Sequence, residues 1–251
     1  MLFYMNTLLQ HKSIRKFTNK PVSAEDLDLI LRAAAQASNT GNMQWYSIIV
    51  TTDTAIKQEL CAKAHFNQQM VAQAPVVLTF CADLQRFTQW CNMHNAQPEY
   101  DNFLSFYTAS IDAVIAAQNA CVAAEKLGLG ICYLGTTNYN AQHIINILHL
   151  PELVVPVTTV VLGYAAEEAP LTGRLPMRAV VHKERYEAFS EQEIAEIYKQ
   201  REEESQQFVS ENSVDNLAQV FTKKRYPGEN NRMFSKALLN VIENARFSTT
   251  N

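Results

Sequence analysis

A short segment near the N-terminus gathers several side chains of the kind that bind anions. Residues 11–17 read His-Lys-Ser-Ile-Arg-Lys-Phe. On a helical backbone Lys12, Arg15 and Lys16 stand at positions i, i+3 and i+4 and share one face. Cations held this closely repel one another unless an anion lies among them. The segment therefore predicts a site for a phosphate or an anionic ring system, with a solvated basic helix end as the simpler alternative.

Composition limits the classes of partner. The chain has 251 residues, of which 47% are hydrophobic and 18% charged, with a formal net charge of −4. This length suits one large domain or two small ones, able to bury roughly 70–75% of the unfolded surface. An acidic chain argues against nucleic acid as a partner. A local basic segment on such a chain favours a small anionic ligand instead.

Cysteine usage and hydropathy indicate a cytoplasmic protein. The five cysteines form no C-x-x-C pair and are odd in number, which is typical of reduced core residues. No run approaches the ~18 apolar residues of a membrane span, and the first ten residues do not resemble a signal peptide. We therefore expect no membrane partner.

Apolar periodicity predicts an α+β layered fold with more helix than sheet. Ser23 and Asp26 form a capping-box pattern at the start of one helix, and Ser190 and Glu193 do so at another. Residues 86–106 show weak periodicity and are interpreted as an irregular covering segment. The expected helices span residues 2–10, 23–37, 110–127, 141–149 and 231–246, and the expected strands span 45–51, 76–82 and 155–164.

Common catalytic signatures are missing from the sequence. It contains no H-E-x-x-H motif, Walker A loop or G-x-S-x-G elbow. The glycines between Gly128 and Gly135 follow a helix rather than a strand, so they are not a dinucleotide-binding fingerprint. The histidines show no metal-ligand spacing, and no metal is expected. A chain without its own acid–base machinery is typical of an enzyme whose cofactor performs the chemistry.

Three blocks in order resemble the nitroreductase family of FMN flavoproteins, in particular its oxygen-insensitive NADPH nitroreductase and NADPH–flavin oxidoreductase branch. The first is HKSIRKFTNKPVSAEDLDLILRAAAQASNTGNMQWYSIIVTTD, the second AAQNACVAAEKLGLGICYLGTTNYNAQHIINILHLP, and the third VVPVTTVVLGYAAEEAPLTGRLPMRAVVHKERY. The resemblance runs from about residue 8 to 187.

The resemblance implies a nitroreductase-like layered fold, with a central, mostly antiparallel sheet flanked by helices, in an intertwined homodimer. Residues 1–187 would form the FMN-binding core, and residues 188–251 a C-terminal helical extension that embraces the partner subunit. The small residues of the 110–127 helix would pack at the subunit boundary.

The resemblance also implies the cofactor contacts. Arg15 is expected at the pyrimidine end of the flavin, where a cation stabilises the reduced, anionic ring. A polar loop is expected to meet the flavin of the other subunit, although such a run is otherwise only a turn. Gln68 matches a ring-edge glutamine, with Gln69 leaving the register open. The implied FMN contacts are His11, Lys12, Ser13, Arg15, Ser38, Asn39, Thr40, Gln68, Tyr133, Leu134, Gly135 and Arg174.

The chain departs from the family in its phosphate clamp. Arg174 lies where the family has a Lys-x-Arg pair, and Thr172 replaces the lysine. One charge-assisted contact is worth about 1.5–3 kcal/mol, so FMN is bound more loosely or another cation substitutes. Lys224, Arg225 and Arg232 resemble the basic loop for the 2′-phosphate of NADPH, with a solvated loop as the alternative.

The resulting hypothesis is an FMN-dependent oxidoreductase that takes two electrons from NADPH by a ping-pong mechanism. The acceptor would be a nitroaromatic, a quinone or free flavin. The alternatives are an FMN-binding homologue without turnover, which sequesters flavin or regulates, a flavin reductase that supplies a monooxygenase, and a helical dimer without flavin.

Overall fold

The computed structural model describes residues 7–249, in two compact units. The core unit runs to Pro170 and resumes at Phe234, and the second unit spans Leu171–Met233. The predicted division into residues 1–187 and 188–251, with an arm around a partner, stays a prediction. The helix expected over residues 2–10 lies largely outside the described residues, and residues 7–9 are helical.

A four-stranded antiparallel sheet forms the centre of the core unit, in the order β1 (Tyr46–Thr51), β2 (Val76–Asp83), β4 (Val154–Gly163), β3 (Gly130–Leu134). This confirms the layered α+β fold and the antiparallel sheet. The sequence did not predict β3, because a five-residue run that starts with a glycine has no readable period. Its pairing with the distant β4 determines that it is a strand.

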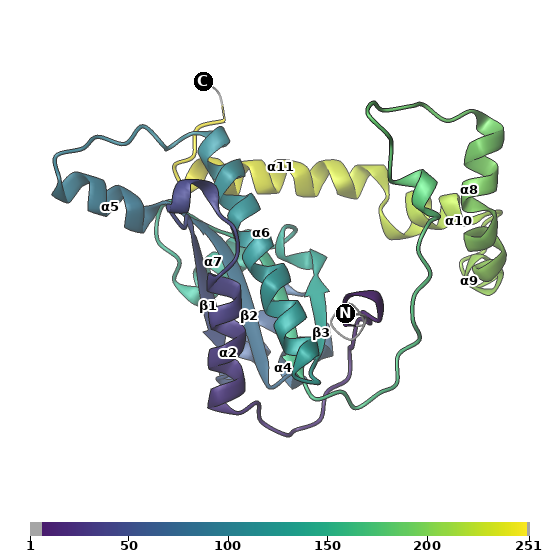
Figure 1. Cartoon of the computed structure of the whole chain (residues 1–251), viewed down its shortest axis with the longest axis horizontal. Helices are drawn as coiled ribbons and strands as arrows, with labels where there is room; N and C mark the ends of the chain where they lie inside the picture. Colours follow the sequence, from purple (N-terminus) through teal and green to yellow (C-terminus); the bar gives the residue numbers. More distant parts are fainter. Residues whose placement is uncertain (1–6, 250–251) are drawn as a thin grey trace. The chain divides into compact units, whose positions relative to one another are not determined.

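Helices α2 (Ala24–Ala35) and α6 (Phe103–Lys126) cover one face of the sheet (Figure 1). Ser23 caps α2 as predicted, accepting a hydrogen bond from the Asp26 amide. Helix α6 begins seven residues earlier than predicted, because the Asn102 side chain caps it. The alanines of α6 expected at a subunit boundary are instead buried in the core of their own chain, so that expectation was wrong; they are Ala113, Ala116, Ala117, Ala120 and Ala124.

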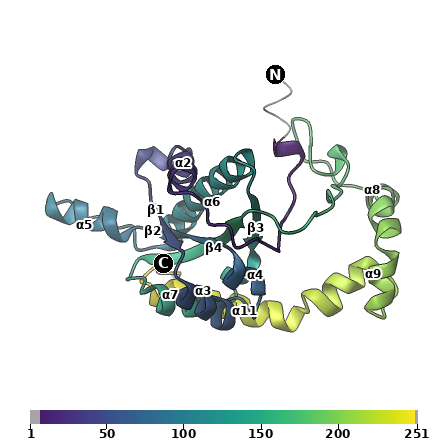
Figure 2. The ribbon, with the colours of Figure 1, turned by 90° about the horizontal axis from the view of Figure 1, so that it is seen from below.

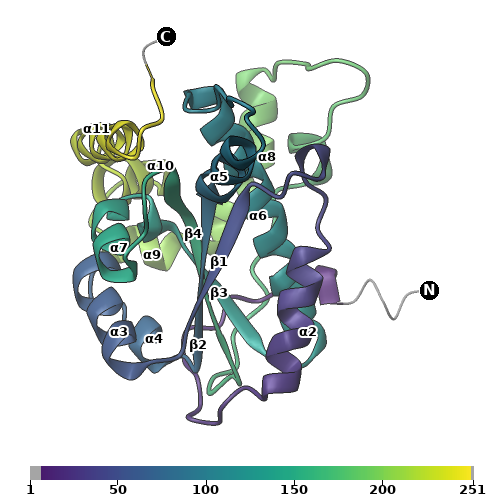
Figure 3. The same cartoon turned by 90° about the vertical axis from the view of Figure 1, so that its left-hand side faces the viewer.

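The opposite face of the sheet carries shorter helices (Figures 2 and 3). They are α3 (Thr54–Glu59), the π-helix η2 (Leu60–Ala64), α4 (Gln69–Gln73) and α7 (Ala141–Leu148). A second hydrophobic cluster fills the space under them, and includes Leu60, Val71 and Ile144 with Val77 and Val161 of the sheet. The helix predicted over residues 141–149 is confirmed.

The segment expected to be irregular is so only in its middle. Residues 94–102 form neither helix nor strand, whereas α5 (Gln85–Met93) and the start of α6 are helical, so the interpretation was wrong for these two ends. Trp45 packs on Phe87 and Tyr100, with ring centroids 5.5 and 5.1 Å apart. These aromatic contacts join residues far apart in the sequence. They stabilise the segment although its sequence shows no clear helical periodicity.

The C-terminal helix α11 (Gly228–Asn244) confirms the amphipathic helix predicted over residues 231–246. Val241 and Ile242 are buried in the core unit with Phe247. Phe234, earlier in the same apolar stripe, stacks on Tyr139 at a centroid distance of 4.6 Å. Part of the stripe therefore covers the core of its own chain.

The second unit is helical. It contains the short 3-10 helix η4 (Met177–Ala179), α8 (Glu191–Glu204), α9 (Gln206–Glu211), α10 (Leu217–Gln219) and the π-helix η5 (Val220–Arg225). Ser190 and Glu193 form the predicted capping box, which lowers the pKa of the Glu193 carboxyl through hydrogen bonds from Ser190. A small cluster of Val209, Leu217 and Val220 forms its core.

Gly130 is the position in β3 where the N-terminal segment approaches most closely, and its replacement tests that contact. A Cβ there would lie 2.6–2.9 Å from three side-chain carbons of Ile14. We expect Gly130→Ala to lower the free energy of unfolding by about 1–3 kcal/mol, measured by urea denaturation. Gly135→Ala is the control, because a Cβ there meets nothing within 4 Å. Equal stability of the two variants would contradict the contact.

Candidate functional site

The N-terminal basic segment is extended rather than helical. Ser13 forms a parallel bridge with Ile131 of β3, and the Ile14 amide donates to the Ile131 carbonyl at 2.9 Å. Ile14 and Phe17 are buried, which anchors the segment against the sheet. The expectation that Lys12, Arg15 and Lys16 share a helical face was therefore wrong. Backbone pairing with a distant strand outweighs the local helical spacing.

This extended backbone sends the basic side chains in different directions. Lys12 lines a pocket of about 290 Å³ with Ile14, Glu125 and Gly130. Arg15 instead lies near the buried Cys132, where its charge opposes the burial that raises the pKa of this thiol. The Ser13 hydroxyl also hydrogen-bonds Cys132 and lowers the same pKa. Ser13 and Arg15 thus both act on Cys132, whereas Lys12 lines the pocket.

Two carboxylates organise the segment without neutralising its cations. Glu125 of α6 contacts His11, with its Oε1 2.6 Å from Nδ1. Glu167 accepts hydrogen bonds from the backbone amides of Arg15 and Lys16, at 2.7 and 3.1 Å. Among residues 7–249, the charged groups of Lys12, Arg15 and Lys16 take part in none of the ion pairs or hydrogen bonds of the structure. The segment keeps unpaired positive charge, as an anion site requires.

A turn with an exposed glycine follows β3. Tyr133 and Leu134, expected within this turn, are the last residues of the strand, and the 3-10 helix η3 (Gly135–Thr137) forms the turn itself. The Tyr133 hydroxyl donates to Gln118 of α6 at 3.4 Å, and burial raises its pKa. Space beside Gly135 is open, since a Cβ built there meets nothing within 4 Å. Its backbone is accessible to a ligand.

Gln68 begins α4 on the face of the sheet opposite α6. The side-chain amide of the neighbouring Gln69 donates to the Asn67 carbonyl and lies 3.8 Å from the Cys61 sulfur. Gln68 is partly exposed, and its side chain makes no hydrogen bond within the described chain. The free amide favours Gln68 over Gln69 as the residue available to a ligand.

Two side-chain hydrogen bonds join the loop before Gln68 to the turn after β3. His65 Nδ1 lies 2.8 Å from Thr136 Oγ1, and Asn140 Nδ2 donates to the Ala64 carbonyl at 2.8 Å. His65 is fully buried, and burial lowers its pKa to about 4. Sequence reasoning missed this residue, because a single histidine between Ala64 and Phe66 matches no motif.

The polar loop at residues 38–40 lies elsewhere on the core unit. The Thr40 amide and hydroxyl both donate to Asp112 Oδ1, at 3.0 and 3.2 Å, and Asn39 Oδ1 accepts from the Gln44 amide. Asp112 is a buried residue of α6 whose Oδ2 has no partner among the described residues. No hydrogen bond of the described chain joins Ser38, Asn39 or Thr40 to residues 11–15 or 133–135. Their contact with a partner's cofactor stays a prediction.

The remaining predicted residues belong to the second unit. The Arg174 guanidinium donates to the carbonyl of Thr172, at 3.1 Å, within its own exposed loop. Lys224 and Arg225 lie on the π-helix η5 rather than on the expected loop, and Arg225 lies over the Phe208 ring at 5.0 Å. Arg232 is exposed near the start of α11. Their cofactor roles stay predictions.

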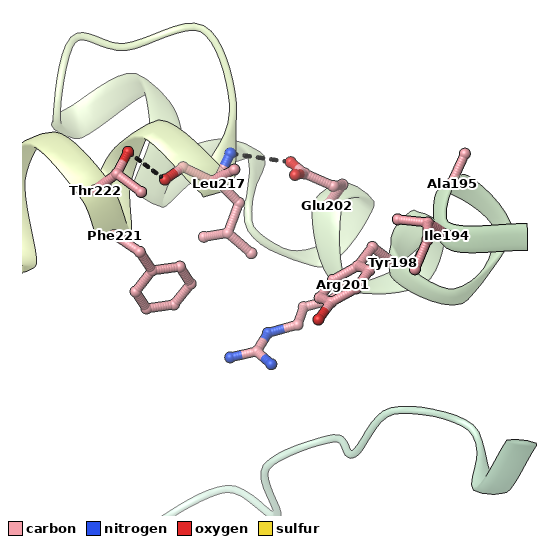
Figure 4. Close-up of a pocket in the computed structure, with 9 residues that line it drawn as sticks. Ile194, Ala195, Tyr198, Arg201, Glu202, Leu217, Phe221 and Thr222 are labelled. Carbon is pink, nitrogen blue, oxygen red and sulfur yellow. Dashed lines mark hydrogen bonds between the residues drawn. The ribbon is translucent and has the colours of Figure 1, made fainter. Parts of the chain in front are cut away.

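The second unit also contains an apolar pocket of about 760 Å³ between α8 and the α10–η5 segment (Figure 4). The Glu202 carboxylate accepts from the Leu217 amide at 3.0 Å, and the Arg201 guanidinium lies 5.6 Å from the Phe221 ring centroid. None of its lining residues was predicted as a site residue.

Comparison with known proteins identifies the family. The Nitroreductase family profile matches residues 8–164. The chain belongs to the nitroreductase family. A Bacillus subtilis protein named FMN reductase (NADPH) is 36% identical over 184 residues, covering 72% of this chain and 74% of the relative. An oxygen-insensitive NADPH nitroreductase from Salmonella typhimurium is 35% identical over 190 residues, covering 75% and 76%.

Solved structures support the fold of this member of the family. A crystal structure from Bacteroides fragilis has a TM-score of 0.94 at 44% identity, and covers 97% of this chain and all of that one. A nitroreductase from B. subtilis has a TM-score of 0.87 at 28% identity, with coverage of 97% and 98%. The predicted family, fold class and NAD(P)H-dependent oxidoreductase type are confirmed.

The described residues contain neither a membrane-spanning helix nor a clustered metal site. No helix within residues 7–249 is both long and apolar enough to cross a membrane. The same residues bring together no group of three His, Cys, Asp or Glu side chains that could hold a metal ion.

The buried His65 makes stability depend on pH. The unfolded chain protonates this imidazole near pH 6.5, whereas the folded chain does so only near pH 4. Between these values the unfolded state binds the extra proton, so stability is full above about pH 6.5 and falls as the pH falls. We expect wild type to lose about 2–3 kcal/mol relative to His65→Leu between pH 7.5 and 4.5, at 1.36 kcal/mol per pKa unit. Urea denaturation of both proteins at each pH measures this difference. If the stabilities of wild type and His65→Leu changed in parallel with pH, the pKa of His65 would be that of an ordinary histidine.

Proposed function

We propose that this nitroreductase is a homodimeric, cytoplasmic FMN-dependent oxidoreductase that takes two electrons from NADPH. Nitroaromatics, quinones or free flavin would accept them in a ping-pong mechanism, in which NADPH gives up its hydride and leaves as NADP⁺ before the acceptor binds. The observation that carries the proposal is the pairing of the Ser13–Arg15 segment with β3. Because the bridge between Ser13 and Ile131 is parallel, the chain runs from Ser13 to Arg15 in the same direction as β3 runs toward the open turn at Gly135. The guanidinium of Arg15 is unpaired among the described residues.

The residues present fit FMN. The cofactor needs cations for its phosphate, polar groups for its ribityl chain, a positive group at its pyrimidine end and an uncovered face. Unpaired cations and the exposed Gly135 backbone satisfy the first and last needs. We assign Arg15 to the pyrimidine end and His11, Lys12 and Ser13 to the phosphate side. Because Thr172 stands where the family has a lysine, we infer that Lys12, whose charged group is unpaired in the described chain, supplies the missing cation.

The chain's own groups then have defined tasks. Bound FMN supplies the hydride-accepting and hydride-donating chemistry. Arg15 stabilises the negative charge of the reduced ring, which favours two-electron over one-electron transfer. Gly135 exposes a backbone N–H without a side chain that blocks access to the ring. The free amide of Gln68 binds the ring edge, and Tyr133 and Leu134 hold the turn through their strand.

The remaining anion contacts are assigned to four basic residues. Arg174 is assigned to the FMN phosphate, and Lys224, Arg225 and Arg232 to the 2′-phosphate of NADPH. Arg225 already lies against an aromatic ring, so Lys224 and Arg232 are the freer cations. An anion-binding cluster of this kind favours NADPH over NADH. The names of relatives from B. subtilis and S. typhimurium, which include NADPH, support this donor.

Helix α6 supports the homodimer through its outer side. While its alanines face the core, an apolar ridge faces outward with a spacing of three and four residues: Leu104, Tyr107, Ile111, Val114 and Ile115. Such a stripe along a helix is typical of helix–helix packing. A second copy of this ridge provides a matching surface, and the loop at Ser38–Thr40, bonded to Asp112 of the same helix, would lie near the boundary.

The loss of the clamp lysine at Thr172 favours one alternative, an FMN-binding homologue without turnover. Anaerobic titration with NADPH distinguishes the two functions. We expect the FMN-loaded protein to lose its yellow colour with one equivalent of NADPH, and to regain it with nitrofurazone or free FMN. Yellow protein that NADPH does not bleach would support the alternative, and colourless protein that takes up no FMN would overturn both.

The same titration tests Arg15. We expect Arg15→Ala to slow bleaching by roughly 10–100-fold, because a charge-assisted contact of about 1.5–3 kcal/mol is lost. Thermal unfolding should change little, since the guanidinium is exposed and unpaired. Lys16→Ala removes the same charge one residue away and should retain the rate. An unchanged rate in Arg15→Ala would refute its assignment.

A charge on the α6 ridge tests the dimer. Ile111 is 43% exposed, and Ile111→Asp should convert a dimer into monomers, measured by light scattering after size-exclusion chromatography. Ile56 on α3 is 37% exposed on the opposite face of the sheet, and Ile56→Asp should leave the mass unchanged. Identical masses for both variants would place the interface elsewhere.

A further inference from the structure

The segment from Leu60 to Gln68 has the least regular backbone on its face of the sheet. It starts with a π-helix, a form often found at functional sites. Phe66 and Asn67 follow with φ of 50° and 56°, in the left-handed region that a bulky residue such as Phe66 rarely adopts. Strain of this kind persists only where the surrounding structure holds it in place.

His65 lies between the π-helix η2 and the two residues with positive φ, Phe66 and Asn67. Its ring is fully buried and bonds Thr136 through Nδ1, whereas Nε2 has no partner in the described chain. A buried polar atom without a partner is costly, and an apolar side chain would fill the same space without it. Packing alone therefore does not explain a histidine at this position.

The His65–Thr136 bond connects the Gln68 loop with the Gly135 turn. Thr136 directly follows Gly135, and Gln68 comes three residues after His65. The bond, together with that of Asn140 to the Ala64 carbonyl, fixes the Gln68 loop and the Gly135 turn relative to each other. These two segments are the ones assigned above to the edges of the flavin ring.

We propose that His65 is a positioning residue for hydride transfer, acting through Thr136 on the Gly135 backbone. This inference rests on the proposed function. The neutral imidazole sets where the Gly135 amide lies relative to Gln68, and so determines how strongly the two segments favour the reduced ring over the oxidised one. His65 itself does not touch the cofactor.

Thr136 gives the sharper test, because Thr136→Val removes the hydroxyl and keeps the shape. We expect an at least tenfold slower anaerobic reduction by NADPH in a single turnover. The preference for reduced over oxidised FMN should also fall about tenfold, a shift of about 30 mV for a two-electron couple. The dissociation constant of oxidised FMN should change less than threefold, because the phosphate contacts are elsewhere. Thr136→Ser keeps the hydroxyl and should restore both the rate and the potential.

His65 variants test the other end of the bond. His65→Asn places an amide near the position of Nδ1 and should recover most of the rate, whereas His65→Leu should behave like Thr136→Val. If His65→Leu does not fold, the Thr136 pair decides. A folded Thr136→Val protein with wild-type rate and potential would overturn the inference and leave the proposed function intact. Wild-type protein that binds FMN but is not reduced would overturn both.

Discussion

The pairing of the N-terminal segment with β3 is the contact on which the rest of the site depends. It is a short stretch of backbone, with Ser13 bridged to Ile131 and Ile14 inserted against Gly130. Without it, Ser13 and Arg15 would have no fixed position relative to the turn that follows the strand. Glycine at position 130 is required because any side chain there would occupy the space of Ile14. The buried Ile14 and Phe17 secure the segment on either side of Arg15 and Lys16.

Electrostatics follows from the same arrangement. The chain is acidic overall, yet its nearest carboxylates do not neutralise the basic segment. Glu167 accepts two backbone amides, and Glu125 is held by His11, so both acids stabilise the backbone path instead of pairing with Arg15. Unpaired positive charge beside an exposed glycine backbone suits a ligand with a negative ring or phosphate. An acidic protein can keep a local basic segment unpaired in this way, as the proposed anion site requires.

The two faces of the sheet have different roles. On the α6 face, alanines allow the helix to approach the sheet closely, and the larger apolar residues of α6 point outward and are exposed. On the other face, short helices and a strained loop place Gln68, His65 and Thr136 near one end of β3. Close packing on the first face gives rigidity, while buried polar contacts on the second fix the orientation of loops.

The sequence by itself determined the family, the α2 and α8 caps, three strands and the residue types of the anion site, because these depend on local spacing and on ordered motifs. The tertiary structure alone decided the rest. It made residues 11–17 extended, since pairing with β3 outweighs helical spacing, and it made 130–134 a strand through a partner thirty residues away. It turned the α6 alanines inward, because the sheet beneath accommodates only small side chains at that distance. His65 is distinguished only by its burial and by its bond to a residue 71 positions along the chain, which no local pattern records.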